Sequence, residues 1–387
     1  MNKEILFLLG VYPSIGGVES ITTNLANEFV RLGIGVHIVS FEQTASLDAM
    51  NLDNRVDVKA LTKPVLSRSN IRFFRNYIHD NRIGIIMNQW CLPFYTTMLI
   101  KSATKGTDCK IIQIHQNNPV TNARLKQIEI ELEYGSTKRF WGKVNWHLIN
   151  LASRLSLRYA YDNCDEFVFL SQTFIQPFLK YIWVRTSSKV AAIPESFSTE
   201  SDGVLPKKEK EILYLGRIDY NQKRVRRVIE IWSELEEVLP DWHLTIVGDG
   251  PDMENVKNMV VGYGLKHVSF EGFQKPDEYF KRAPIMLLVS EYEGFGIVLA
   301  EAQSYGCVPI ALDSYSALHD IVESGKNGII VSYPYVRDNF VSSIKLCVSN
   351  EKLLNQMALN GMKSVDKFKM YRVLDMWIKL LSQIEKQ

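Results

Sequence analysis

The sequence predicts an α/β protein made of two doubly wound domains, each with a parallel sheet and helices on both faces. Short apolar runs recur along the whole chain, and helical periodicity follows them. Strands that alternate with helices are typical of parallel sheets, because each parallel connection needs a crossover. The alternation occurs twice within 387 residues. Since single cores stop growing at about 250–300 residues, we expect two domains rather than one wide sheet.

Apolar runs define the strands of both domains. The expected strands of the first domain are 5–9, 36–40, 83–87, 110–115 and 166–171, with a helix at 20–32. Those of the second are 212–215, 244–247, 268–271, 285–290, 308–311 and 328–331. Parallel strands of such sheets present their carboxyl ends at one edge, where ligands bind.

A polar, turn-rich stretch separates the two series of strands. Ile193-Pro194 ends the first series, and a linker is expected near residues 195–210. The domains are therefore predicted as 1–197 and 205–365. The last segment, 366–387, repeats apolar residues at i+3/i+4 spacing and is predicted to be an amphipathic helix that packs back toward the N-terminal domain. These residues are Tyr371, Leu374, Trp377, Leu381 and Ile384.

The composition argues against several classes of protein. With 46% apolar and 23% charged residues it is that of a soluble globular protein, and a net charge of +2 argues against a dedicated nucleic-acid binder. The five cysteines are scattered and lack a C-x-x-C pair, which favours reduced thiols in a cytoplasmic protein. No signal peptide is expected, and the apolar stretches at 83–100 and 285–299 contain too many polar residues for membrane spans.

The most specific motif is Glu293-Gly-Phe-Gly-Ile-Val-Leu-Ala-Glu301, which follows the expected strand at 285–290. A helix N-terminus presents free N–H groups to an anion, and Gly294 and Gly296 let that backbone approach closely. Glu293 and Glu301 are able to accept hydrogen bonds from sugar hydroxyls. The motif predicts a site for a phosphorylated sugar; the alternative is a strand–helix turn with two solvated acids.

Two cations follow the first strand of the second domain. Arg217 and Lys223 are expected at the carboxyl edge of its sheet. A guanidinium and an ammonium that converge there suit a diphosphate. The alternative is a solvated basic loop, which the nearby acidic motif makes less favourable.

Three weaker signals occupy other strand ends. Gly16 and Gly17 precede the first helix, although their spacing does not match the G-x-G-x-x-G fingerprint. Gly248 follows a strand and suits either a tight turn or the close approach of a nucleoside. His115 ends an apolar strand and is either structural or catalytic. No D-x-D, H-E-x-x-H, Cys/His cluster, Walker motif or G-x-S-x-G elbow is present, so no metal site or cofactor is expected.

In combination, these motifs resemble the retaining glycosyltransferases of family 4, which have the two-Rossmann-domain glycosyltransferase B architecture. The resemblance covers nearly the whole chain and is strongest from residue 212 to residue 331. It rests on Ser290-x-x-Glu293-Gly-Phe-Gly-x(4)-Glu301, with Gly216-Arg217-x(5)-Lys223 and Gly248-x-Gly-Pro251 in support. It implies two domains facing across a cleft and metal-independent transfer of a hexosyl residue with retention. The implied donor is a nucleoside-diphosphate sugar, more often a UDP-sugar than GDP-mannose, and the acceptor is a glycan or lipid-linked glycan of the bacterial surface.

The resemblance also implies roles for individual residues. Arg217 and Lys223 would neutralise the donor diphosphate, Glu293 would position hydroxyls of the donor sugar, and His115 would assist catalysis. Glu301 would bind the ribose. The other implied donor contacts are Gly16, Gly17, Gly248, Phe273, Gln274, Gly294, Phe295, Gly296, Ile297, Val298 and Leu299.

The chain departs from the family pattern at three places. Arg224 stands where Gly commonly follows the lysine, and would add a phosphate contact or alter the turn. Pro194-Glu195-Ser196 replaces a commoner Pro-Asn, which puts a hinge contact in doubt. Arg226-Arg227 would add positive charge beside the diphosphate site.

A mixture of cations and aromatic residues at 137–161 suggests a face that lies on an anionic membrane and reaches a lipid-linked acceptor. The residues Arg68, Arg72, Phe73, Phe74 and Arg75 would extend it. The alternative is a helix with a solvated cationic side. The protein is accordingly expected in the cytoplasm, with a peripheral position at the inner face of the cell membrane.

Two other functions are compatible with these motifs. A sugar-nucleotide epimerase or hydrolase on the same scaffold would act on the donor alone. A non-catalytic nucleotide-sugar-binding subunit would bind the donor without turnover. A dinucleotide dehydrogenase is disfavoured because neither domain carries the phosphate fingerprint.

Overall fold

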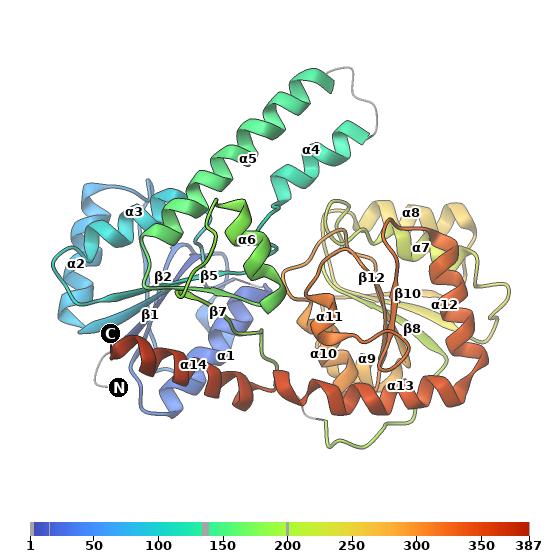
Figure 1. The fold of residues 1–387 in the computed structure, drawn as a ribbon. Coiled ribbons are helices and arrows are strands. Elements are labelled where there is room, and N and C mark those ends of the chain that lie inside the picture. Colours follow the sequence, from blue (N-terminus) through green and yellow to red (C-terminus); the bar gives the residue numbers. More distant parts are fainter. Residues whose placement is uncertain (1–3, 15, 134–138, 199–200, 387) are drawn as a thin grey trace. The chain divides into compact units, whose positions relative to one another are not determined.

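The computed structural model describes residues 4–14, 16–133, 139–198 and 201–386. The chain divides into two compact units (Figure 1). The first contains Met1–Glu195 and Met370–Gln387, and the second contains Ser196–Lys369. Thr137 and Lys138, at the start of the predicted cationic stretch, lie outside the described residues.

The first unit contains a seven-stranded parallel sheet of order β3-β2-β1-β4-β5-β6-β7. Its strands are β1 (Glu4–Val11), β2 (Val36–Glu42), β3 (Asp57–Ala60), β4 (Ile83–Asn88), β5 (Lys110–His115), β6 (Glu166–Phe169) and β7 (Val190–Ala192). The helices are α1 (Gly17–Arg31), α2 (Arg68–Asp80), α3 (Phe94–Ala103), α4 (Ala123–Glu133), α5 (Arg139–Asp162), α6 (Ile175–Tyr181) and α14 (Met370–Glu385), with short 3-10 turns η1 (Leu47–Met50) and η2 (Gln172–Phe174). The chain starts in the middle of the sheet and winds to both edges, which confirms the predicted doubly wound class.

Strand β1 shows why both faces of this sheet are covered. Successive side chains of a strand point to opposite faces. Ile5 and Phe7 belong to an apolar core that includes residues of α1 and α14, whereas Leu6 and Leu8 belong to one that includes residues of α2 and α3. A strand that is buried on both faces is a continuous apolar run, so this strand could be predicted from the sequence.

Helix α14 contributes to the core of the first unit. Its residues Val373, Trp377, Leu381 and Ile384 are buried in the same cluster as β1 and α1. The C-terminal segment therefore returns to the N-terminal sheet.

The second unit contains a six-stranded parallel sheet of order β10-β9-β8-β11-β12-β13. Its strands are β8 (Glu211–Leu215), β9 (His243–Val247), β10 (Val268–Gly272), β11 (Ile285–Leu288), β12 (Val308–Leu312) and β13 (Ile329–Val331). Its helices are α7 (Arg226–Ser233), α8 (Met253–Tyr263), α9 (Asp277–Arg282), α10 (Ile297–Ser304), α11 (Leu318–Ile321), α12 (Arg337–Ser349) and α13 (Glu351–Ser364), followed by the 3-10 turn η3 (Val365–Phe368). This order is again doubly wound, and it places the carboxyl ends of β8 and β11 beside each other.

Every strand expected from the sequence is present, with ends shifted by a few residues. The edge strands β3 and β7 were missed. They contain four and three residues, none of them fully buried. An edge strand with partly exposed side chains carries little of the apolar signal on which the other strands were identified.

Helices α4 and α5 form a hairpin that projects from the first unit (Figure 1). In the part of the chain that the structure describes, no helix combines the length and apolar character needed to cross a membrane.

Candidate active site

Close backbone contacts shape the carboxyl edge of the second sheet. Gly248 has φ +134°, and a Cβ atom there would lie 2.0 Å from the carbonyl oxygen of Gly216. A Cβ atom on Gly250 would lie 2.2 Å from the carbonyl oxygen of Ile218. These glycines therefore let the loops after β8 and β9 pack against each other. A nucleoside contact at Gly248 stays a prediction.

Asp219 organises the loop that carries the two predicted cations. Its carboxylate accepts hydrogen bonds from the backbone N–H groups of Gln222 at 2.7 Å and Lys223 at 3.1 Å. It also accepts one from Nε of Arg217 at 2.7 Å. Sequence reasoning missed Asp219, although an aspartate at the start of a turn commonly bonds the backbone a few residues later.

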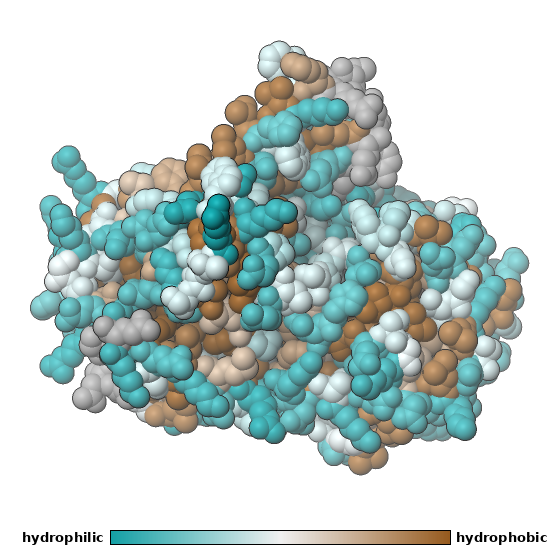
Figure 2. Space-filling view, viewed as in Figure 1, coloured by the Kyte–Doolittle hydropathy of each residue, from teal (hydrophilic) through white to brown (hydrophobic). Residues whose placement is uncertain are grey.

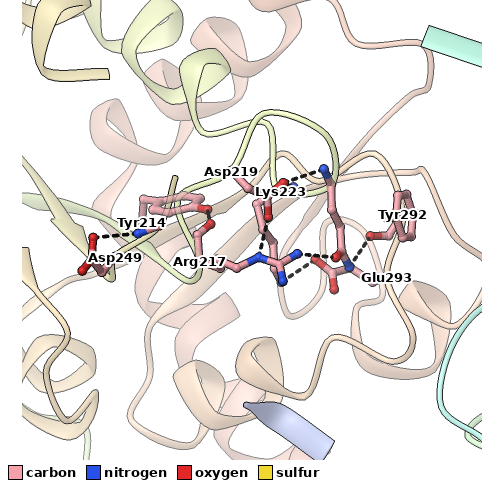
Figure 3. Close-up of polar contacts among 9 residues, drawn as sticks. Tyr214, Arg217, Asp219, Lys223, Asp249, Tyr292 and Glu293 are labelled. Atoms are coloured by element: carbon pink, nitrogen blue, oxygen red, sulfur yellow. Dashed lines mark hydrogen bonds and ion pairs between the residues drawn. The ribbon is translucent and has the colours of Figure 1, made fainter. Parts of the chain in front are cut away.

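The structure brings Arg217, Lys223 and Glu293 together at this edge (Figure 3). Lys223 Nζ lies 2.7 Å from Glu293 Oε1, and the Glu293 side chain is 7% exposed. The guanidinium of Arg217 donates to Gln222 Oε1 at 3.0 Å, yet its side chain remains 59% exposed. Lys223 is thus partly buried beside a buried carboxylate, with 20% of its side chain exposed, while Arg217 presents its charge to solvent.

The loops that carry Lys223 and Glu293 are joined through their backbones. The N–H of Glu291 donates to the carbonyl of Gln222 at 2.8 Å, and the Gln222 amide donates to the carbonyl of Tyr292 at 3.3 Å. The distance between the ammonium and the carboxylate is consequently fixed by more than their own attraction.

Arg224 is directed into the protein. Its φ of +52° lies in the left-handed region, which favours the glycine that the family commonly has there. The buried side chain pairs with Glu291, Nε to Oε2, at 3.5 Å. Arg227 donates to the same carboxylate oxygen at 2.8 Å, and Tyr333 donates to the other at 3.0 Å.

Carboxylates offset part of the positive charge expected around the diphosphate site, since Arg224 and Arg227 share Glu291 and Arg226 pairs with Asp252. Burial alone would raise the pKa of Glu291, but Arg227, Tyr333 and Arg224 hold it below its ordinary value. Arg226 binds Asp252 through two hydrogen bonds of 2.8 and 2.6 Å. Arg226 and Arg227 therefore both have carboxylate partners, and Arg227 shares Glu291 with Arg224; an added positive charge beside the diphosphate site stays a prediction.

Helix α10 begins at the glycine turn of the main motif. Gly296 caps it at φ +82°, and a Cβ atom there would lie 2.3 Å from the hydroxyl of Tyr315. The side chains of Phe295 and Leu299 are buried, so only their backbones can meet a ligand. The N–H of Leu299 already donates to the carbonyl of Gly296 at 3.0 Å. The anion-binding N–H groups of α10 would therefore precede Leu299.

Glu301 has a different environment from Glu293, although both belong to one motif. Among the described residues, its carboxylate has no ion-pair partner and no hydrogen-bond donor. Burial, and then the charge of Asp277, raises the pKa of Glu301 to about 7. A desolvated acid without a partner is suited to bind the hydroxyls of a ligand.

Phe273 and Gln274 follow β10 and are exposed. The side chain of Phe273 is 70% exposed. The Gln274 side-chain amide donates to the carbonyl of Glu271 at 3.3 Å. Their predicted contact with a base remains a prediction.

His115 ends β5 in the first unit, in an aromatic setting. The ring stacks on Phe167 and Phe169 at centroid distances of 6.5 and 6.4 Å, and Nδ1 lies 2.9 Å from the carbonyl oxygen of Asn117. Burial lowers the pKa of His115 to about 4. The imidazole is therefore neutral near pH 7, able to exchange hydrogen bonds but not to carry a charge.

Gly16 and Gly17 open α1 in the same unit. A Cβ atom on Gly16 would meet the Glu19 carboxylate, with Oε2 at 2.2 Å, whereas one on Gly17 would meet nothing within 4 Å. The fold itself does not require glycine at 17. Open space at a helix N-terminus suits an approaching anion.

The proposed extension of the cationic face through α2 is only partly supported by the structure. Phe74 is fully buried in the core between the sheet and α2, so its assignment to an exposed face is wrong. Phe73 is 40% exposed. Arg75 donates to the carbonyl of Ser102 at 2.6 Å.

Comparison with known proteins identifies both halves of the chain. The sequence model of Glycosyltransferase Family 4 matches residues 15–200, and that of Glycosyl transferases group 1 matches residues 197–364. An uncharacterized glycosyltransferase of Haemophilus influenzae is 20% identical over 97% of this chain and 99% of its own. A lipopolysaccharide 1,6-galactosyltransferase of Salmonella typhimurium is 31% identical, over 38% of this chain and 42% of its own. Among solved structures, Anabaena HepE in complex with UDP and glucose has a TM-score of 0.76 at 16% identity, covering 98% of this chain and 100% of the other.

Proposed function

Because the chain belongs to the group 1 glycosyltransferases of the family 4 type, with the glycosyltransferase B fold, we propose that it transfers a hexosyl residue from a UDP-sugar to a bacterial surface glycan. The transfer proceeds with retention of configuration and without a metal ion. The acceptor is a glycan or a lipid-linked glycan. The observation that carries this proposal is the partly buried Lys223–Glu293 pair beside Arg217, at the carboxyl edge of the second sheet.

The cations supply what a departing nucleoside diphosphate needs. Negative charge develops on the diphosphate as the glycosidic bond breaks, and fixed cations aimed at that charge lower the barrier. Asp219 fixes the direction of the Arg217 guanidinium, and Glu293 fixes the Lys223 ammonium. The N-terminus of α10 adds the partial positive charge of its free N–H groups.

Glu293 and Glu301 serve two parts of the donor. Glu293 is held by Lys223 within a buried site, which suits a carboxylate that orients sugar hydroxyls rather than one that attacks the anomeric carbon. Glu301, which lacks a partner among the described residues, accepts the ribose hydroxyls. Retention then follows from attack on the face from which the phosphate leaves, with that phosphate assisting the deprotonation of the acceptor.

Relatives support the donor and acceptor classes. UDP and glucose are bound in the similar Anabaena structure, and the Salmonella relative is named for lipopolysaccharide. The neutral imidazole of His115 exchanges hydrogen bonds with the donor sugar or the acceptor. Synthesis of a surface glycan places the enzyme in the cytoplasm, at the inner face of the cell membrane.

The test is the release of nucleoside diphosphate from a panel of sugar nucleotides, with and without glycan acceptors. Acceptor-dependent release of UDP supports transfer. Equal release without acceptor indicates a hydrolase, and conversion of the sugar nucleotide without release indicates an epimerase. Binding without turnover under every acceptor indicates a non-catalytic subunit.

A further inference from the structure

One face of helix α5 is apolar and exposed. Trp141, Leu148, Leu151 and Leu155 repeat at spacings of seven, three and four residues, which places them on one side of the helix. Their exposed fractions are 69, 63, 46 and 54%. Large apolar side chains that are exposed together, rather than singly, mark a surface that contacts a protein, a membrane or a ligand. We call these four residues the α5 stripe.

The opposite face of α5 already has a partner. The indole N–H of Trp146 donates to Glu129 of α4 at 3.1 Å, and the Asn122 amide donates to the hydroxyl of Ser153 at 3.2 Å. The stripe is therefore not the side that α4 covers. Figure 2 shows apolar surface along the α5 side of the projecting hairpin.

The apolar surface continues onto α3. A hollow of about 300 Å³ lies at the base of the stripe, and it is lined by Phe94, Met98, Ala152, Leu155, Ser156 and Tyr159. Phe94 is itself 52% exposed. The surface thus has both a ridge and a recess that accepts hydrocarbon.

Charge indicates what covers this surface. Helix α5 contains four Lys or Arg residues, and its single acid is its last residue, Asp162. Arg158 lies next to the stripe, and Arg154 and Lys143 lie farther round the same side of the helix, at spacings of four and eleven residues; the three form its cationic edge. Asp162 pairs with Arg158 at 2.8 Å, so the rest of the helix presents only positive charge.

An exposed tryptophan stands at the same cationic edge. The guanidinium of Arg154 lies 3.3 Å from the ring centroid of Trp183, and Arg158 donates to the carbonyl of Ile182 at 3.1 Å. Trp183 is 54% exposed and has φ +58°, an unfavourable conformation for a large side chain. Tryptophan is enriched at the level of lipid headgroups, where one side of the ring is apolar and the other is wet.

We propose that α5 lies flat on an anionic phospholipid membrane, with the stripe among the acyl chains and the cationic edge at the headgroups. Helices that bind in this way combine a strong apolar face with a Lys- and Arg-rich flank. Pairing of two copies through the stripe would bring like charges together, whereas anionic lipid neutralises them. The role of this surface depends on the proposed function in one respect: the surface brings the enzyme to a lipid-linked acceptor.

The test is flotation of the full-length protein with vesicles of phosphatidylcholine, with and without about a third of phosphatidylglycerol. We expect binding to the anionic vesicles that weakens with added salt. L148S/L155S should lower the partition coefficient by about tenfold or more, and K143E should lower it on anionic vesicles only. Val261 of α8 is 79% exposed, so V261S is a matched control that should bind like the parent.

Three results would overturn the proposal. They are no binding to anionic vesicles at low salt, equal binding by L148S/L155S, and a dimer in sedimentation velocity that L148S/L155S abolishes. UDP binding on the same samples reports the donor site of the second unit separately. Failure of the membrane surface is thereby distinguished from failure of the proposed function.

Discussion

The ammonium of Lys223 lies 2.7 Å from the carboxylate of Glu293, and the two residues come from loops that follow different strands of one sheet. Each side chain is the main counter-charge of the other, in a site that is largely shielded from solvent. Removing one of them leaves the second desolvated and unpaired, which is costlier than removing both.

The first prediction is a double-mutant cycle on this pair. K223M should destabilise the protein by about 3 kcal/mol because Glu293 loses its partner. K223M/E293Q should recover most of that stability while activity stays at least about a hundredfold below the parent. Denaturant unfolding and initial rates measure the two effects. E293Q alone completes the cycle, and a destabilisation of the double variant equal to the sum of the two single effects would show that the pair is not coupled.

The second prediction concerns the pH dependence of stability set by Glu301. The pKa of its carboxyl is about 7 in the folded protein and 4.5 ordinarily, so between these values the folded state binds more protons than the unfolded state. Stability should therefore fall by about 3 kcal/mol as pH rises from 4.5 to 7, at about 1.4 kcal/mol per pKa unit, and level off above.

The variant E301Q cannot titrate at this position, so it is the control against which the parent is compared. The difference in unfolding free energy between the parent and E301Q should shift across that pH range in favour of the variant. Urea unfolding at several pH values measures it. A constant difference would mean that Glu301 is not desolvated.

The third prediction separates the two contributions of Arg224. Both R224G and R224A lose the contact with Glu291, but only alanine keeps a side chain in the left-handed backbone. R224A should be less stable than R224G by about 1 kcal/mol. Thermal unfolding of the two variants side by side decides it, and equal stability would contradict the strained turn.

The fourth prediction contrasts two glycines. G248A should destabilise the second unit strongly, because the new methyl group would lie 2.0 Å from the Gly216 carbonyl oxygen. G17A should leave stability within about 0.5 kcal/mol of the parent, because nothing lies near the added atom. If the phosphate approaches there, G17A should nevertheless raise KM for the donor. Unchanged kinetics in a folded G17A would remove Gly17 from the donor site.

The fold class could be predicted from the sequence because most strands of both sheets are buried on two faces and are therefore apolar runs. The sequence also predicted Arg217, Lys223 and Glu293 as one group, since the carboxyl ends of neighbouring parallel strands meet at one edge. The edge strand β7 was invisible because its three residues are only partly buried.

The ion-pair partners of charged residues were harder to predict than which residue types form the site. Arg226 and Arg227 look like free cations in the sequence, but Asp252 and Glu291 pair with them from segments 26 and 64 residues away. Phe74 was placed on a surface because its neighbours are cationic, whereas the helical period directs it into the core. Pairing between distant segments depends on tertiary structure, which local pattern does not contain.

Calorimetric titration with UDP in the presence of EDTA measures whether Arg217 and Lys223 hold a nucleoside diphosphate without a metal ion. We predict that the parent binds UDP in EDTA and that R217A/K223M weakens the affinity by about a hundredfold, since two charge-assisted contacts are lost. L148S/L155S should bind UDP like the parent. Binding that requires a divalent cation, or equal affinity in R217A/K223M, would show that these two cations do not hold the diphosphate by themselves.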